Sequence, residues 1–281
     1  MGAMIGNRFG LAWAALTWAA LAVPAYATGI YPWMPAQQRV ETLADRVLPP
    51  TGFERVPAEP GSFAAWLRAL PLKAERAPVM LFDGRTKPRQ DVQAAVIDID
   101  IGSRDLQQCA DAIMRLRAEW LFANGRQRDI GFNFTGGGRV GFERYSTGQR
   151  PDAKGRRWTA SAKPDASYPS FRKYMDLVFA YAGTASLEKE LKSVPASDVQ
   201  IGDVFIKGGF PGHAVLVADI AVNSLTKSKR MLLVQSYMPA QDMHVLKNFA
   251  NGDGSPWYAV PTGDLATPEW TFAAGSLRRW P

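Results

Sequence analysis

Cysteine and histidine are scarce in this chain. Its 281 residues include one cysteine, Cys109, and two histidines, His213 and His244. A single cysteine cannot form an intramolecular disulfide, so the fold must depend on packing. The same scarcity limits any thiol chemistry to one nucleophile, and it limits the bases that could serve that nucleophile to two imidazoles.

Several motifs of nucleotide and serine chemistry are also missing. The glycine run at 136–138 is not followed by the Lys-Ser/Thr of a phosphate loop. The chain has no Gly-x-Ser-x-Gly elbow for a serine nucleophile. We therefore expect no cofactor and no serine hydrolase.

The only long apolar run lies at the N-terminus. Arg8 precedes an apolar stretch from Leu11 to Val23, and the small-x-small sequence Ala25-Tyr26-Ala27 follows. This pattern predicts a cleaved signal peptide over 1–27, because a membrane anchor needs about 20 apolar residues. A retained anchor is the alternative. We expect a periplasmic or secreted protein without a stable membrane anchor after cleavage.

The charge of the chain favours anionic partners. The formal net charge is +7, and removal of Arg8 with the signal peptide leaves 7 − 1 = +6. Basic clusters lie at 154–157 and 227–230, each beside turn-forming residues. In a periplasm this balance favours an anionic wall polymer before nucleic acid, which we do not expect as a partner. Solvated surface loops are the simpler interpretation of both clusters.

Hydrophobic periodicity predicts helices first and strands afterwards. Residues 28–60 are rich in proline and predict an extended lead-in with one short helix around 37–47, and 61–281 predict a single α+β domain. The predicted helices cover 63–70, a segment capped by Ser103, 170–181 and 186–191. Three strands at 203–207, 213–222 and 231–238 are joined by short turns, which is typical of an antiparallel meander.

Cys109 and His213 form the strongest candidate pair. If Ser103 caps the helix, Cys109 lies in its second turn on the apolar face, where a buried structural cysteine is the alternative interpretation. His213 follows a Gly/Pro turn and opens a strand, and Gln235 or Ser236 on the next strand could orient the imidazole. His244 is the competing base.

Two local segments carry a resemblance to known hydrolases. The segment GDVFIKGGFPGHAVLV followed by LLVQSY resembles the histidine hairpin of secreted cysteine–histidine amidohydrolase/peptidase and NlpC-type wall hydrolases, and Gln108-Cys109 resembles their nucleophile motif. The resemblance implies a papain-like arrangement, with a nucleophile helix packed on an antiparallel sheet. It assigns Cys109 as nucleophile, His213 as base and Gln235 as orienting residue. Those families place the cysteine in the first helical turn, from which a Ser103 cap would depart.

A second resemblance extends along nearly the whole chain. Through LQQCADAIMRLRAEW, FAYAGTASLEKEL and QSYMPAQDMHVLKN, the sequence resembles an uncharacterised family of exported bacterial proteins that carries domain of unknown function 4846. This resemblance implies export and one coherent domain, and it implies no activity.

The sequence thus supports two functional hypotheses. The first is an exported cysteine amidase or peptidase acting on wall peptides, in which backbone N–H groups near Cys109 with Gln107 or Gln108 stabilise the oxyanion. The second is a non-catalytic periplasmic binding or scaffold protein, for which aromatic residues near turns would contact the ligand: Trp158, Trp257, Tyr258 and Trp270.

A metal site is a further alternative. Asp98 and Asp100 alternate along a predicted strand, and with a histidine they could bind a divalent cation. Alternating aspartates more often form the polar face of a strand. We therefore expect no metal.

Overall fold

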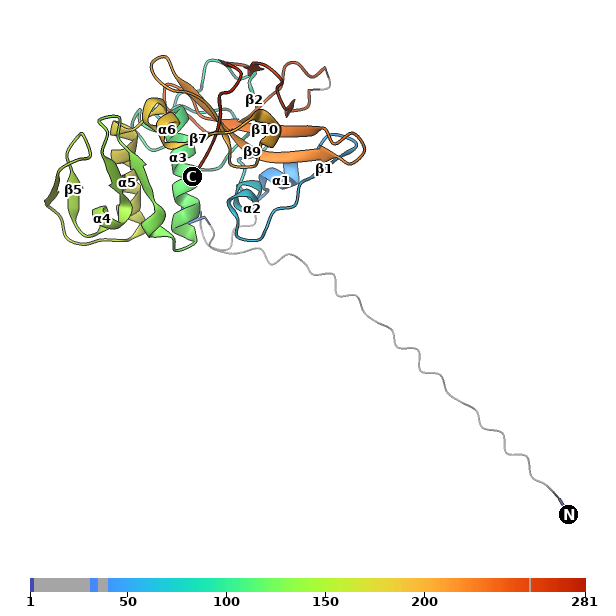
Figure 1. Cartoon of the computed structure of the whole chain (residues 1–281), viewed down its shortest axis with the longest axis horizontal. Helices are drawn as coiled ribbons and strands as arrows, with labels where there is room; N and C mark the ends of the chain where they lie inside the picture. Colours follow the sequence, from blue (N-terminus) through green and yellow to red (C-terminus); the bar gives the residue numbers. More distant parts are fainter. Residues whose placement is uncertain (3–30, 35–39, 253) are drawn as a thin grey trace.

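A computed structural model describes residues 1–2, 31–34, 40–252 and 254–281 of the chain. Apart from its first two residues, the predicted signal peptide lies outside the described residues. The described part is an α+β structure built on one large antiparallel sheet, as the sequence predicted (Figure 1). Within it, no helix combines the length and the apolar character that crossing a membrane requires.

The large sheet has nine strands. Seven of them follow the order β2-β11-β10-β9-β8-β15-β7, while β1 also pairs with β9 and β12 with β10. The bounds are β1 Phe53–Arg55, β2 Gln93–Val96, β7 Lys192–Ser193, β8 Val204–Lys207, β9 His213–Asn223, β10 Lys229–Gln235, β11 His244–Leu246, β12 Trp257–Ala259 and β15 Leu277–Arg279. The consecutive antiparallel pairs β8–β9 and β9–β10 confirm the predicted meander.

Three small hairpins surround this sheet. Their strands are β3 Gly131–Asn133 with β4 Arg139–Gly141, β5 Gln149–Pro151 with β6 Trp158–Ala160, and β13 Leu265–Ala266 with β14 Thr271–Phe272. The hairpin of β5 and β6 lies within the segment 146–169.

Six α-helices are described: α1 Leu43–Arg46, α2 Phe63–Arg68, α3 Cys109–Ala123, α4 Phe142–Ser146, α5 Tyr168–Tyr181 and α6 Thr184–Glu190. Two short 3₁₀ turns cover Gln127–Asp129 and Ala196–Asp198. The segment predicted as a lead-in supplies α1, which lies within the short helix expected around 37–47, and β1, which joins the large sheet through β9.

Strand β9 is buried on both faces. Its successive side chains point to opposite faces of the sheet, and each face contributes to a different core cluster. Ala214, Leu216 and Ala218 belong to the same core cluster as the apolar residues of α3. Val215 and Val217 belong to a second cluster, which the β13–β14 hairpin completes. Figure 1 shows α3 between α5 and the strands β9 and β10, and α3 packs on the sheet through these two strands.

The start of α3 differs from the prediction. The helix begins at Cys109 and not after Ser103, so Cys109 occupies its first turn. Asp105, in the segment expected to be helical, accepts the backbone N–H of Ala240 at 2.7 Å. Asp111 accepts the N–H of Gln108 at 3.1 Å. A tertiary contact with a loop 135 residues away therefore competes with local helix formation, and the helix starts after it.

Candidate functional site

Cys109 lies at the N-terminal end of α3, against the start of β9. Cys109 is buried, with 7% of its surface exposed to solvent. Burial, followed by the nearby Asp111 carboxylate, raises the pKa of the thiol to about 11, while the backbone N–H groups of Ala110 and Ala214 oppose this shift. At pH 7 the resting group is therefore a neutral thiol.

His213 is the first residue of β9, and Gln235 is the last residue of the neighbouring β10. Nε2 of His213 lies 2.8 Å from Oε1 of Gln235, so the predicted orienting contact is present. Burial lowers the pKa of His213 to about 4, the Lys87 ammonium adds to this effect, and the Gln235 bond opposes it. His213 is therefore neutral at pH 7.

Cys109 and His213 line the same cleft, which has a volume of about 570 Å³. Gln108, Thr184 and Tyr237 also contribute to its wall. Among the described residues, no hydrogen bond joins the Cys109 thiol to His213. Alternation along β9 explains this separation, since the imidazole lies on the face of Val215, whereas α3 covers the other face. Both residues line the cleft at the start of β9.

Aromatic rings hold the imidazole from several sides. Ring centroids of Tyr237, Trp270 and Phe272 lie 4.7, 5.5 and 5.7 Å from that of His213. Two further apolar residues of the cleft reach solvent: Phe210 is 92% exposed and Met238 is 49% exposed. The cleft therefore combines a fixed imidazole with an apolar entrance.

The two glutamines before Cys109 lie in different places. Gln108 lines the cleft, and its Nε2 donates to Asp105 at 2.9 Å. Gln107 is buried outside the cleft lining, where its Oε1 accepts from Arg115 at 2.7 Å. Of the two residues predicted to support an oxyanion, only Gln108 has the position for it.

His244, the competing base, lies behind Gln235 and does not line the cleft. Its Nε2 is 3.2 Å from Nε2 of Gln235, and its Nδ1 is 2.9 Å from the carbonyl oxygen of Asp242. Burial lowers its pKa to about 3. His213 is thus the histidine that shares a cleft with Cys109.

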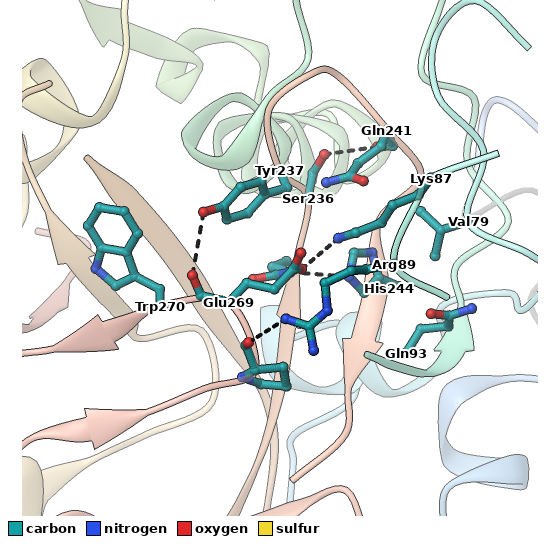
Figure 2. Close-up of polar contacts among 12 residues, drawn as sticks. Val79, Lys87, Arg89, Gln93, Ser236, Tyr237, Gln241, His244, Glu269 and Trp270 are labelled. Carbon is teal, nitrogen blue, oxygen red and sulfur yellow. Dashed lines mark hydrogen bonds and ion pairs between the residues drawn. The ribbon is translucent and has the colours of Figure 1, made fainter. Parts of the chain in front are cut away.

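Sequence reasoning missed a buried ion pair behind these residues. Nζ of Lys87 lies 2.5 Å from Oε2 of Glu269, and Nε2 of Gln235 donates to the same oxygen at 2.7 Å. Figure 2 shows Lys87 and Glu269 directed toward each other, with His244 beside them. No local pattern marks this pair, because 182 positions separate its members.

Of the two aspartates considered for a metal site, Asp100 is engaged by arginines. Asp100 forms ion pairs with Arg115 at 2.7 Å and with Arg172 at 3.2 Å. The described part of the chain contains no group of three or more His, Cys, Asp or Glu residues arranged to hold a metal ion.

Fold and site together define an α+β protein in which a helix-terminal cysteine shares a cleft with a histidine held by glutamine. A family model described as domain of unknown function (4846) matches residues 43–279, and the chain belongs to that family. Neither the curated proteins nor the solved structures provide a match.

Proposed function

We propose that this protein is an exported cysteine hydrolase of papain-like arrangement that cleaves amide bonds, with wall peptides as its substrates. One observation carries the proposal: Cys109 in the first turn of α3 shares a cleft with His213, whose Nε2 is occupied by Gln235. Nδ1 of His213 has no hydrogen-bond partner among the described residues. That nitrogen is therefore available to a thiol in the cleft.

In the proposed reaction, the Cys109 sulfur attacks the substrate carbonyl carbon while its proton passes to Nδ1 of His213. The carbon–nitrogen bond then breaks, and the imidazolium returns the proton to the leaving amine. Water, deprotonated by His213, hydrolyses the resulting thioester and restores the thiol. Because both groups are neutral at rest, the proton moves during attack, and the two groups must approach each other once substrate is bound.

Backbone donors at the start of α3 would stabilise the oxyanion. The first N–H groups of a helix have no partner within that helix. The N–H of Cys109 is one of them, and the Gln108 side chain lies beside it at the cleft. Donors directed at the developing negative charge supply the largest single contribution in this type of reaction.

The cleft lining favours an uncharged or cationic acyl group. It contains Asp105 and Asp111 but no lysine or arginine, and its aromatic residues include Phe179, Phe210 and Trp270. This contrasts with the +7 charge of the whole chain. We therefore propose that an anionic wall polymer would contact the basic outer surface, while the cleft accepts an apolar peptide segment.

The test measures hydrolysis of acetyl-leucyl-, acetyl-lysyl- and acetyl-glutamyl-aminomethylcoumarin by the purified chain. Cys109→Ala should lower kcat/KM at least about 1000-fold, because it removes the nucleophile. The control is Ser62→Ala, which removes the side-chain oxygen that caps α2 and should leave the rate unchanged. The glutamyl substrate should be the slowest. If no substrate is turned over and 4-nitrophenyl acetate leaves no acetyl group on Cys109 by mass spectrometry, the chain is not this hydrolase.

A non-catalytic binding protein is the second candidate. The raised thiol pKa and the missing Cys109–His213 hydrogen bond favour it. The rate of iodoacetamide labelling of Cys109, measured as a function of pH, distinguishes the hydrolase from the binding protein. A rate that increases tenfold per pH unit up to about 11, even with peptide bound, would indicate a thiol that never meets its base. Labelling that peptide binding accelerates at pH 7 would support the hydrolase.

A further inference from the structure

We infer that Glu269 and His244, two hydrogen-bond acceptors behind Gln235, set the tautomer of His213 and so act as positioning residues. The role of this tautomer in catalysis rests on the proposed function, because a base needs its free lone pair directed toward the thiol. The inference itself follows from which atoms can donate and which can accept.

The side-chain amide of Gln235 has only one orientation that satisfies its neighbours. The Glu269 carboxylate is paired with Lys87 and can only accept, so the Gln235 NH₂ group must face it. The carbonyl oxygen of that amide is then directed at Nε2 of His213, 2.8 Å away. Because a carbonyl oxygen can only accept, Nε2 must carry the hydrogen. In the neutral ring, the lone pair is therefore on Nδ1.

His244 imposes the same orientation independently. The Asp242 carbonyl oxygen lies 2.9 Å from Nδ1 of His244, so that nitrogen must donate. Nε2 of His244 is then an acceptor, and it faces the second N–H of Gln235 at 3.2 Å. The two histidines of the chain should consequently hold opposite tautomers: Nε2–H in His213 and Nδ1–H in His244.

Segments from distant parts of the chain hold the two acceptors in place. Lys87 lies 5.4 Å from the centroid of the Tyr237 ring, and Arg89 donates to the carbonyl oxygen of Pro268 at 2.9 Å, next to Glu269. Figure 2 shows the Lys87 side chain directed at Glu269 and the Arg89 guanidinium directed at this backbone carbonyl oxygen. The Lys87 and Glu269 side chains are 6% and 9% exposed, so water has little access to compete for these bonds.

The experiment records long-range ¹H–¹⁵N correlation spectra of the full chain labelled with ¹⁵N-histidine, at pH 7 and without substrate. Only two histidines contribute, and a His213→Gln spectrum assigns them. The wild type should show a single Nε2–H tautomer for His213 and a single Nδ1–H tautomer for His244. His213 in the Nδ1–H form would overturn the inference.

Variants then test the cause. Glu269→Met and His244→Phe each remove one acceptor, and in the double variant the amide of Gln235 can turn. A hydrogen bond to a charged group corresponds to a ratio of about tenfold or more between the populations of the two amide orientations. Without the two acceptors this preference is lost, and His213 should show both tautomers. If the double variant fails to fold, Glu269→Lys, which replaces an acceptor by a donor, provides the same test. A single Nε2–H tautomer in every folded variant would overturn the inference.

A matched control removes another buried carboxylate. Asp203→Asn breaks the pair with Arg279 away from Gln235 and should leave both tautomers as in the wild type. Since the spectra need no turnover, they separate the two proposals: the expected tautomers in a chain without hydrolytic activity would refute only the proposed function. If the chain is a hydrolase, the double variant should lower kcat with little change in KM.

Discussion

The polar groups behind Cys109 differ in kind from those behind His213. Behind Cys109, the fully buried Arg115 contacts Asp100 at 2.7 Å, Gln107 at 2.7 Å and Glu119 at 3.2 Å. Behind His213, an amide and a second imidazole make the contacts, and the Lys87–Glu269 ion pair lies one residue further back. Full charges on the helix side hold the segment before Cys109, whereas on the sheet side a charged acceptor, Glu269, and a neutral one, His244, determine where protons lie.

The helix side should therefore dominate stability. Arg115→Met removes the nearer of the two cations that face the buried Glu119 carboxylate, which should lower the free energy of unfolding by about 3–5 kcal/mol. Urea unfolding measures the loss. Arg104→Met, which breaks the exposed pair with Asp176, should cost less than about 1 kcal/mol. Equal losses in the two variants would contradict the comparison.

The sheet side should respond to acid. The pKa values of His213 and His244 are lowered to about 4 and about 3 from 6.5, so the unfolded chain binds more protons below pH 6.5. Their contribution to stability is complete above pH 6.5 and is lost progressively as the pH falls toward 4 and 3. Between pH 6.5 and 5 each should cost about 2 kcal/mol.

Urea unfolding at pH 7 and pH 5 isolates this contribution by comparing the wild type with His244→Gln. The variant should lose less stability on acidification, even if it starts from a lower value. Asp111 and Glu119, whose pKa values burial raises, act in the opposite direction in both proteins and cancel in the difference. Identical pH slopes would show that His244 is not buried in its neutral form.

The smallest expected effect concerns one hydroxyl on the helix side. Tyr168 donates to Glu119 at 2.9 Å, and Tyr168→Phe should lower the free energy of unfolding by about 1–2 kcal/mol while Arg115 still pairs with Glu119. The control is Tyr145→Phe, because the described residues provide no hydrogen bond to that hydroxyl. A larger loss for Tyr145→Phe in thermal unfolding would refute the assignment.

Sequence patterns predicted the parts that depend on neighbouring residues. Apolar runs over 213–222 and 231–238, with a short turn between them, were enough to predict the meander that carries His213 and Gln235. The start of α3 could not be predicted in this way. Ser103 has the chemistry of a helix cap, but the bond from the Ala240 N–H to Asp105 removes this segment from the helix.

The residues behind the site were beyond sequence reasoning for a related reason. Lys87 and Glu269 show no spacing or periodicity that connects them, and each alone is an ordinary charged residue in a turn-rich segment. They become significant only when the hairpin of β13 and β14 and the segment before β2 both reach Gln235.

The sequence by itself determined which groups could act. One cysteine, two histidines and the strand alternation around them restrict any thiol chemistry to Cys109 with His213 or His244. The tertiary structure decided between the histidines by placing His213 at the cleft and His244 behind Gln235. It also decided the protonation of both groups, because burial and neighbouring charges set a pKa and both depend on residues far apart in the chain.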